Sequence, residues 1–453
     1  MTPLHIRTRQ SADLGGAAGE PGRPGAARFG VAGSAGTRLL GGPPRSAGTE
    51  GLADHERRLG PLSLDHVPPA ALRDAVRESR LLGRGGGQFP TATKLDVAAQ
   101  APGTPIVVVN ASEGEPASRK DRTLLELRPH LVLDGAEVAA AATGADEIIV
   151  YLHRRRLRST SALEEALRER HRAGRPVRLV DAPERYVAGE TSAVVSYLGG
   201  TGALPRRDAL PAAAAGVAGR PTVVGNAETI AHLALVARFG AAWFATAGSP
   251  EAPGSTLVTL AGAVAVPGVV VEVLGGVTIG DLLATVGGLD VPPRAVLLGG
   301  YAGTWIDGDV AWRTPLERHA LGVAGASLGC GLIAVLGGGA CGLAETARLL
   351  RWMAGQSAGQ CGPCAIGLPS LSVLADEVVG GLASRRDVRR LRQLAASIRG
   401  RGACGHPTGA VNLLESAIAT FERELAQHLR GRACPEGRGP GTFPLPAEEG
   451  PRP

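Results

Sequence analysis

Aromatic residues make up only 3% of this 453-residue sequence, and lysine is nearly absent. Among 48 basic residues, Lys94 and Lys120 are the only lysines. Hydrophobic cores must therefore be built from Leu, Val and Ala, and an aromatic stacking site has few candidate residues. With 44% hydrophobic and 20% charged residues the chain can still bury a sizeable core, which excludes wholesale disorder.

Cysteines and long apolar runs are also scarce. Six cysteines in a chain of this length exclude a disulfide scaffold. A long uncharged stretch, Ala252–Val271, contains Pro267 and Gly268, so it predicts a β-hairpin and not a membrane span. No signal peptide is recognised, and we expect a cytoplasmic protein with reduced thiols and no direct membrane insertion. The net charge of +6 comes from arginines scattered among acids, so no nucleic-acid role is expected.

The two ends of the chain differ in composition from its middle. Residues 1–60 and 433–453 are rich in Gly, Ala, Pro and Arg without periodicity, and we expect both to be disordered tails. Residues 61–250 alternate short β-branched runs with helical patterns. This alternation predicts an α/β domain with a mostly parallel sheet, with strands near 106–109, 148–152 and 177–180 and helices near 131–143 and 160–172.

The pattern changes after residue 250. Residues 251–335 predict a small β-grasp-like domain with a linker, because two strand-like runs are followed by a short helix near 279–286. Residues 336–432 read as helical, with apolar residues at spacings of three and four. Helices are expected near 342–354, 366–379, 386–398 and 411–425, which would form a four-helix bundle.

A glycine-rich segment, residues 83–94 (GRGGGQFPTATK), is the first candidate site. Adjacent glycines let backbone N–H groups approach an anion closely, and Lys94 closes the segment. It is no dinucleotide fingerprint, because Gln88 stands where a glycine is needed and no strand precedes it. It does not match a Walker loop either. A flexible turn without a ligand is the alternative interpretation.

Three further segments carry polar residues at places that suit a ligand. Asn110, Glu113 and Glu115 follow the strand at 106–109, and ligands of α/β sheets bind at the carboxyl ends of strands. The segments 186–191 (YVAGET) and 225–229 (GNAET) each precede an apolar helical run, and helix N-termini bind phosphate well. A solvated turn and ordinary helix capping are the alternatives.

The cysteines supply the last candidate site. Cys361 and Cys364 form a C-x-x-C pair before a helix, and Cys404 lies forty residues further on. This arrangement suggests a metal, an iron–sulfur cluster or a redox disulfide, while the lack of a second C-x-x-C argues against a four-cysteine zinc site. Possible fourth ligands are Cys341, Cys434 and His406. Cys330, in an apolar run, is expected to be a buried small residue.

Taken in order, these motifs resemble the NADH-oxidising, FMN-carrying subunit of respiratory complex I (the F subunit of NADH:quinone oxidoreductase), here as a divergent, actinobacterial-type member. Relatives occur in NAD-linked hydrogenases and formate dehydrogenases. The resemblance covers roughly residues 75–430. It implies an α/β flavin domain, a β-grasp (SLBB-like) domain and a helical bundle that holds a [4Fe–4S] cluster.

The resemblance also implies roles for single residues. The glycine-rich segment would hold the FMN phosphate and ring edge, the acidic loop would bind FMN and position NADH, and the YVAGE and NAET segments would cover the flavin and contact its phosphate and ribityl chain. Lys94, Glu113 and Glu115 would act in catalysis. The cofactor-binding residues would be Gly83, Arg84, Gly85, Gly86, Phe89, Lys94, Asn110, Glu113, Tyr186, Gly189, Glu190, Asn226 and Thr229, and the metal ligands Cys361, Cys364 and Cys404.

The implied chemistry is hydride transfer from NADH or NADPH to the flavin, then single-electron transfer to the cluster. From there the electrons would pass to a ferredoxin-like or thioredoxin-like iron–sulfur subunit or to a membrane redox complex, which would bring the protein to the inner face of a membrane. The basic chain ends could dock an acidic ferredoxin, since complementary charge accelerates association.

Several positions depart from the family pattern. Ala358 replaces the first cysteine of C-x-x-C-x-x-C, which leaves open a substituted fourth ligand, a [3Fe–4S] form or no cluster. Only Phe89 matches the aromatic residues that stack on adenine in the family. Thr191 and Ser112 replace two acidic residues near the adenosine ribose, which could admit NADPH.

These departures leave two other interpretations open. One is a non-catalytic electron-transfer or assembly subunit that keeps the fold but no longer binds nicotinamide. The other is a β-grasp ligand-binding protein with a vestigial flavin domain. The retained Lys94, Glu113 and Glu115 favour the oxidoreductase.

Overall fold

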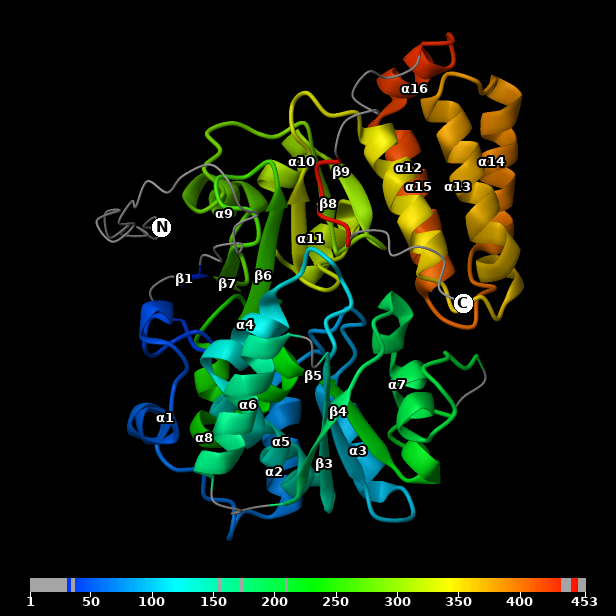
Figure 1. The fold of residues 1–453 in the computed structure, drawn as a ribbon. Helices are drawn as coiled ribbons and strands as arrows, with labels where there is room; N and C mark the ends of the chain where they lie inside the picture. Colours follow the sequence, from blue (N-terminus) through cyan, green and yellow to red (C-terminus); the bar gives the residue numbers. More distant parts are fainter. Residues whose placement is uncertain are drawn as a thin grey trace.

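The computed structural model describes residues 37–153, 156–170, 175–207, 210–432 and 441–446, together with the backbone of 31–33. Two β-sheets organise these residues, and helices cover both sheets (Figure 1). The C-terminal helices stand together at one end of the molecule, beside the second sheet and above the first in that view.

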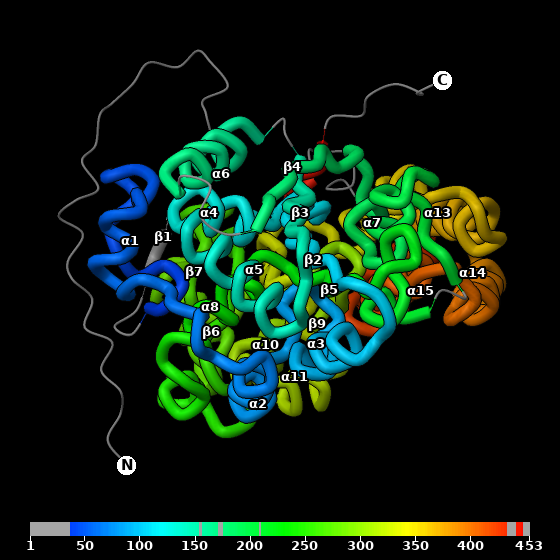
Figure 2. The backbone as a smooth tube through the Cα atoms, turned by 90° about the horizontal axis from the view of Figure 1, so that it is seen from below, coloured from blue at the N-terminus to red at the C-terminus, as the bar shows by residue number. Residues whose placement is uncertain are grey.

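The first sheet is parallel throughout, as the alternation of strands and helices predicts. Its order is β4 (Val177–Asp181), β3 (Glu147–Leu152), β2 (Ile106–Ala111) and β5 (Thr222–Asn226). Alternate side chains of β2 face opposite layers, because successive residues of a strand point to opposite faces. Val107 and Val109 join the core with helices α5 (Pro129–Thr143) and α8 (Ala227–Ala245), whereas Ile106 and Val108 join α7 (Thr191–Leu198). Figure 2 shows α5 and α8 on one side of the strands and α7 on the other.

The helices of this α/β region connect the strands and flank them on both sides. Their bounds are α2 (Pro69–Ser79), α3 (Thr91–Gln100), α4 (Lys120–Leu127), α5 (Pro129–Thr143), α6 (Leu157–Glu169), α7 (Thr191–Leu198) and α8 (Ala227–Ala245). The polar loop that follows β2 and the start of α8 that follows β5 lie at the same edge of the sheet, since these strands are parallel neighbours. This edge faces the second sheet.

The second sheet is mixed. Its order is β1 (Val31–Gly33), β7 (Val270–Leu274), β6 (Ser255–Gly262), β10 (Leu332–Val335), β8 (Ala295–Leu298) and β9 (Thr304–Asp307). Strands β6 and β7 pair antiparallel around Pro267 and Gly268, so the predicted hairpin is confirmed. One face is covered by α9 (Ile279–Thr285), α10 (Gly308–Arg313) and α11 (Arg318–Val323), and the other packs against the C-terminal helices.

The C-terminal helices lie side by side in Figure 1. They are α12 (Gly342–Gly355), α13 (Leu368–Val379), α14 (Arg385–Ile398), α15 (His406–Thr420) and α16 (Glu422–His428). The helix expected near 411–425 begins earlier and is broken at Phe421, whose backbone leaves the helical region. Phe421 is buried against Trp305 of β9, with ring centroids 5.1 Å apart, so packing against the sheet sets the break.

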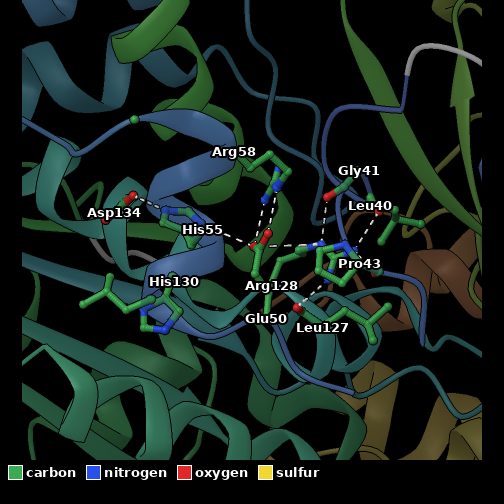
Figure 3. Close-up of polar contacts among 12 residues, drawn as sticks. Leu40, Gly41, Pro43, Glu50, His55, Arg58, Leu127, Arg128, His130 and Asp134 are labelled. Atoms are coloured by element: carbon green, nitrogen blue, oxygen red, sulfur yellow. Dashed lines mark hydrogen bonds and ion pairs between the residues drawn. The ribbon is translucent and has the colours of Figure 1, made fainter. Parts of the chain in front are cut away.

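The prediction of a disordered N-terminal tail is wrong for residues 37–60. Helix α1 (Leu52–Leu59) is formed, and the side chains of Glu50 and His55 are buried. His55 Nε2 lies 2.7 Å from Asp134 Oδ2 on α5, and Arg58 donates to Glu50 at 2.7 and 2.8 Å (Figure 3). Burial alone would raise the pKa of Glu50, but His55 and Arg58 lower it to about 2.

Arg128 completes this N-terminal anchor, because its buried guanidinium donates to the carbonyls of Leu40 and Gly41 at 3.1 and 2.8 Å (Figure 3). The segment is thus held by buried charge and not by an apolar stripe. Hydrophobic periodicity in a sequence reveals an apolar stripe, but it does not reveal a segment that is held by buried charge. Residues 1–30 and 34–36 of the expected tail lie outside the described residues.

The C-terminal tail also contradicts the expectation of disorder where it is described. Phe443 is buried among Tyr301 and Trp305, and Glu345 accepts hydrogen bonds from the N–H groups of Thr442 and Phe443. The remainder of 433–453 lies outside the described residues. Within the described part of the chain, no helix combines the length and the apolar character that a membrane crossing requires.

Candidate functional site between the two sheets

The glycine-rich segment forms a tight, open loop in front of α3. Gly83 N–H donates to the Phe89 carbonyl at 2.9 Å and closes the loop. Gly86 has φ +109°, a conformation that side chains with a Cβ rarely adopt, and no atom lies within 4 Å of a Cβ built at Gly87. The backbone of this loop is therefore accessible to a ligand at close range.

The same loop is tied to α8. The backbone N–H of Arg84 donates to Thr229 Oγ1 at 2.8 Å, and a Cβ at Gly85 would lie 3.2 Å from the Cβ of Asn226. Two segments that the sequence separates by more than 140 residues are thus adjacent. The structure thus brings together four residues that the sequence analysis assigned to one site, namely Arg84, Gly85, Asn226 and Thr229.

Lys94 is a half-buried cation that forms no ion pair with a carboxylate of the described chain. It projects from α3, and its Nζ donates to the Val224 carbonyl at 3.2 Å and lies 5.9 Å from the Phe89 ring centre. Burial lowers the pKa of Lys94. A half-buried ammonium without a carboxylate partner is suited to an anionic ligand. Phe89 is 48% exposed and available for stacking.

The acidic loop after β2 contains two carboxyl groups in opposite states. Glu113 has φ +43° and is buried, and it accepts hydrogen bonds from Asp121 N–H and Arg122 Nε at 3.0 and 2.9 Å. Burial alone would raise its pKa, but Arg122 and Arg156 lower the pKa of Glu113 to about 2. Both of its oxygens are engaged, so it shapes the loop.

Glu115 is the contrasting carboxyl. Its Oε2 accepts the Tyr301 N–H at 3.0 Å, whereas its Oε1 is buried without a partner. Burial raises the pKa of Glu115 to about 8, despite the hydrogen bond from Tyr301, and nearby Glu113 adds to the rise. It is therefore protonated at neutral pH and can donate a hydrogen bond. Two neighbouring carboxyl groups with pKa values pushed apart are a frequent mark of functional sites.

Sequence reasoning assigned no role to the charged groups beneath this site. Lys120 Nζ contacts Asp121 Oδ1 at 2.8 Å, Glu228 Oε2 at 2.9 Å and Asn226 Oδ1 at 2.9 Å. Burial would lower the pKa of Lys120, but the two carboxylates raise it above its ordinary value. The only feature of the sequence that could have drawn attention to Lys120 is that it is one of just two lysines.

Glu228 extends this network to the second sheet. Its Oε1 accepts the Leu257 N–H of β6 at 2.8 Å and the Thr256 hydroxyl at 3.0 Å. Asn226 caps α8 by accepting the Glu228 N–H, and its amide donates to Asp121 at 2.6 Å. The side chain of Asn226 is thus fixed by the protein on both its oxygen and its nitrogen.

The segment 186–191 covers the acidic loop. A Cβ at Gly189 would come within 2.7 Å of Ser112 Oγ, and Asn110 Nδ2 donates to the Gly189 carbonyl at 2.8 Å. Glu190 accepts the N–H groups of Ser192 and Ala193 at 2.9 and 3.0 Å as the cap of α7, whose first residue is Thr191. The observed contacts of Glu190 are therefore those of an ordinary helix cap, which the sequence analysis gave as the alternative to a ligand-binding role.

Tyr186 joins this region to the C-terminal helices. A Cβ at Gly114 of the acidic loop would lie 3.0 Å from the Tyr186 carbonyl. On its other side, the Tyr186 ring packs against Trp352 and His406 with centroids 5.3 and 5.4 Å apart. Burial raises the pKa of Tyr186, and the titratable groups of Glu115 and Cys404 add to the rise. One half-buried side chain thus lies between the acidic loop and the cysteine region.

Cys361, Cys364 and Cys404 meet at the ends of α12, α13 and α14. Cys364 is buried in a π-helical turn (Pro363–Gly367), and burial raises its pKa to about 12, with further contributions from Cys361 and Cys404. The backbone N–H of Ala358 contacts the Cys364 thiol, so the substituted position lies beside the thiols. No three His, Cys, Asp or Glu side chains of the described residues are placed to hold a single metal ion.

The other cysteines lie elsewhere. Cys341 caps the start of α12, with its Sγ 3.1 Å from Glu424 Oε2, and a helix of 14 residues is roughly 20 Å long. It is therefore too distant to join the other three thiols. Cys330 is half-buried, less than the sequence predicts; it lies beside Glu115, and the burial of its thiol raises its pKa. Cys434 lies outside the described residues.

Comparisons with known proteins agree with the resemblance. Residues 76–235 match the family model described as the Nuo51 FMN-binding domain. Residues 344–428 match the NADH-ubiquinone oxidoreductase-F iron-sulfur binding region. These two ranges contain most of the residues that the sequence singles out. The matched ranges also include α5, the first part of α8 and nearly all of the C-terminal helices.

Curated relatives cover most of the chain. The second of the F subunits of NADH-quinone oxidoreductase in Rhizobium meliloti is 30% identical over 390 residues, which are 82% of this chain and 92% of the relative. The F subunit of the same enzyme in Streptomyces coelicolor is 32% identical over 384 residues, 82% of this chain and 85% of the relative.

A solved structure shares the fold. A chain of an NAD+-reducing [NiFe]-hydrogenase in the H2-reduced state superposes with a TM-score of 0.74 at 31% identity, over 80% of this chain and 62% of that chain. The described chain thus spans less than two thirds of that hydrogenase chain. By the identity and coverage of its relatives, the chain belongs to the family of NADH-quinone oxidoreductase F subunits.

Proposed function

We propose that this chain takes electrons from NADH at an FMN site between the two sheets and passes them through an iron–sulfur cluster to a partner. The observation that carries the proposal is Lys94, a half-buried cation without a carboxylate partner among the described residues, beside an open glycine loop. When bound, FMN would supply hydride acceptance and one-electron release, and the cluster would supply one-electron transfer.

The residues of the site would divide this work. The loop at Gly83, Gly85 and Gly86 would admit the flavin and its phosphate, and Lys94 would balance the added negative charge. Glu115, protonated near pH 7, would donate a hydrogen bond through its free Oε1. We assign Glu113 the task of holding the loop, since its oxygens are engaged by Asp121, Arg122 and Arg156.

The cysteine region would hold the cluster. The three thiols lie together at the ends of helices, and a [4Fe–4S] cluster spreads its ligands over separate iron atoms, so the thiols need not converge on one point. Tyr186, packed between the acidic loop and His406, would keep water out of the path between the two centres. We further propose that α12–α15 form a four-helix bundle and that the second sheet is an SLBB-like β-grasp domain.

The partner would be an acidic, ferredoxin-like iron–sulfur protein. Support comes from α14, whose exposed arginines form no ion pair with any carboxylate in the described ranges: Arg385, Arg386, Arg389, Arg390 and Arg392. The helix ends against the cysteine turn, because a Cβ at Gly367 would lie 2.8 Å from Ile398. The five described cysteines are unpaired, which agrees with a reducing, cytoplasmic compartment.

An anaerobic titration of the FMN- and iron–sulfide-reconstituted chain with NADH tests the proposal. Bleaching of the flavin band followed by loss of cluster absorbance is the expected result. A bound flavin that dithionite bleaches and NADH does not would favour the second candidate, a non-catalytic electron-transfer subunit. The scarcity of aromatic residues supports that candidate, because Phe89 is the one residue that matches the positions at which the family stacks on adenine.

The nucleotide itself needs a second titration. Thr191 and Ser112 replace acidic residues of the family, and loss of negative charge relaxes the exclusion of a 2′-phosphate. We therefore propose that NADPH also reduces the flavin. An NADPH titration of the same sample tests this proposal. If micromolar NADH reduces the flavin and NADPH does not, the proposal that NADPH is also a substrate is contradicted.

A further inference from the structure

The cluster site lacks one cysteine of the family pattern, and the position concerned offers no replacement. Ala358 contacts the Cys364 thiol through its backbone N–H only. Cys341 is held at the far end of α12 by Glu424, and Glu190 is engaged as the cap of α7. Among the described residues, the remaining source of a fourth ligand is another side chain near the three thiols.

His406 has the features of such a ligand. Its ring is buried, and its Nε2 lies 2.9 Å from the Met353 carbonyl at the end of α12. A carbonyl only accepts hydrogen bonds, so Nε2 carries the proton and Nδ1 keeps its lone pair. Nδ1 is buried without a hydrogen-bond partner. A histidine that donates one ring N–H to a backbone carbonyl while its other nitrogen binds metal is the usual arrangement of ligating histidines.

The location of His406 agrees with this role. It follows Cys404 by two residues, and its backbone N–H donates to the Cys404 thiol. Its ring also packs against Tyr186, 5.4 Å between centroids, on the side that faces the acidic loop. The unpartnered nitrogen therefore belongs to the same turn as one thiol of the cluster site.

We propose that His406, through Nδ1, is the fourth ligand of a [4Fe–4S] cluster also held by Cys361, Cys364 and Cys404. This inference rests on the proposed function. The bond forms by donation of the Nδ1 lone pair to iron, so no proton leaves His406 and no oxidant is needed. A neutral imidazole in place of a thiolate leaves the cluster one unit less negative, which makes its reduction easier.

The first experiment uses the native chain. It is produced with ¹⁵N-labelled histidine, reconstituted anaerobically with FMN, iron and sulfide, and reduced with dithionite. We expect four irons per chain and a strong ¹⁵N coupling to the cluster in electron–nuclear double resonance spectra. The measurement needs no variant, so it does not depend on the folding of one.

Two variants extend the test. Ala358→Cys restores the family pattern and should remove the ¹⁵N coupling and lower the midpoint potential of the cluster. His406→Leu should yield three irons per chain and the paramagnetic signal of an oxidised [3Fe–4S] cluster. The matched control is His319→Leu, an exposed histidine on α11, which should change neither the iron content nor the spectrum.

The outcomes separate this inference from the proposed function. A native chain that holds four irons without histidine coupling, or three irons in the oxidised state, overturns the role of His406 and leaves the electron pathway standing. A native chain that takes up no iron overturns both. An unchanged iron content, spectrum and potential in His406→Leu would also contradict the ligation.

Discussion

The two ends of the proposed electron path are stabilised in different ways. On the flavin side, ionised side chains are buried and paired, as in the contacts of Lys120 with Asp121 and Glu228. On the cysteine side, Cys364 is a buried thiol with a raised pKa, in the apolar core that the C-terminal helices form. The first region is held by paired charges of the protein itself, whereas the second is held by apolar packing around the thiol.

This difference follows from what each region must hold. Protein charges fix the acidic loop and the start of α8 before any cofactor binds, since Glu228 and Asn226 are already satisfied by protein partners. Thiols bind iron as thiolates, and metal binding would remove the protons that burial retains on Cys364. Four predictions, ordered by their effect on folding, test this contrast.

The largest effect is expected for Lys120→Met. Removal of one partner from a buried ion pair leaves an uncompensated charge and costs about 3–5 kcal/mol. Urea unfolding of the cofactor-free chain measures the loss. Lys94→Met is the matched control, because Lys94 is half-buried and has no carboxylate partner in the described residues. It should leave the stability unchanged or raised while weakening FMN binding, and equal losses in both variants would refute the contrast.

The second prediction concerns pH and Glu115. Its pKa is about 8 in the folded chain, against 4.5 for an unperturbed Glu. Below pH 4.5 both states carry the proton, and as the pH rises to about 8 only the folded state retains it. Stability is therefore lost across this window, on the order of a few kcal/mol.

Glu115→Gln removes that dependence, because an amide does not titrate. Urea unfolding at pH 5 and pH 8.5 should show a smaller decline in the variant than in the native chain, with the variant more stable at the higher pH. A parallel decline in both proteins would show that Glu115 is ionised in the folded state.

The third prediction tests the cysteine side. Cys364→Ala removes one buried sulfur, so the cofactor-free chain should lose only about 1 kcal/mol in urea unfolding. The reconstituted variant should lose its cluster absorbance and iron. A cofactor-free loss as large as that of Lys120→Met would mean that the thiols, like the flavin-side charges, hold their region without metal.

The smallest effect on folding is expected for the arginines of α14. Arg386→Glu, Arg389→Glu and Arg390→Glu together should change stability by about 0.5 kcal/mol or less, because exposed charges contribute little. Binding of an acidic [2Fe–2S] ferredoxin at low salt should weaken about tenfold. The matched control reverses Arg313, Arg318 and Arg423, which are exposed on other elements.

Ferredoxin binding is compared at low and high ionic strength by surface plasmon resonance. High salt should erase the difference between the native chain and the α14 variant, since exposed charges are screened. Equal weakening in both triple variants would indicate an effect of net charge alone and would remove α14 as the docking surface.

Much of the fold could be predicted from the sequence. The strands of the first sheet are short β-branched runs between helical patterns, and local composition suffices to place them. The hairpin at Pro267 and Gly268 and the helices α12, α13 and α14 follow from the same kind of pattern. The N-terminal anchor was missed because Glu50, His55 and Arg128 are held by charge, and charged residues in a Gly- and Pro-rich segment resemble a solvated tail.

The sequence by itself determined the family, the glycine loop and the three thiols, because these depend on residue type and spacing within short segments. Only the tertiary structure decided what each polar group does. Asn226 and Glu190 cap helices, Lys120 and Glu228 join the two sheets, and His406 keeps a free nitrogen beside Cys404. The caps contact residues only two or three positions along the chain, so a local pattern can suggest them. The pairing of Lys120 with Glu228 joins buried residues more than a hundred positions apart, and no local pattern records their burial or their pairing.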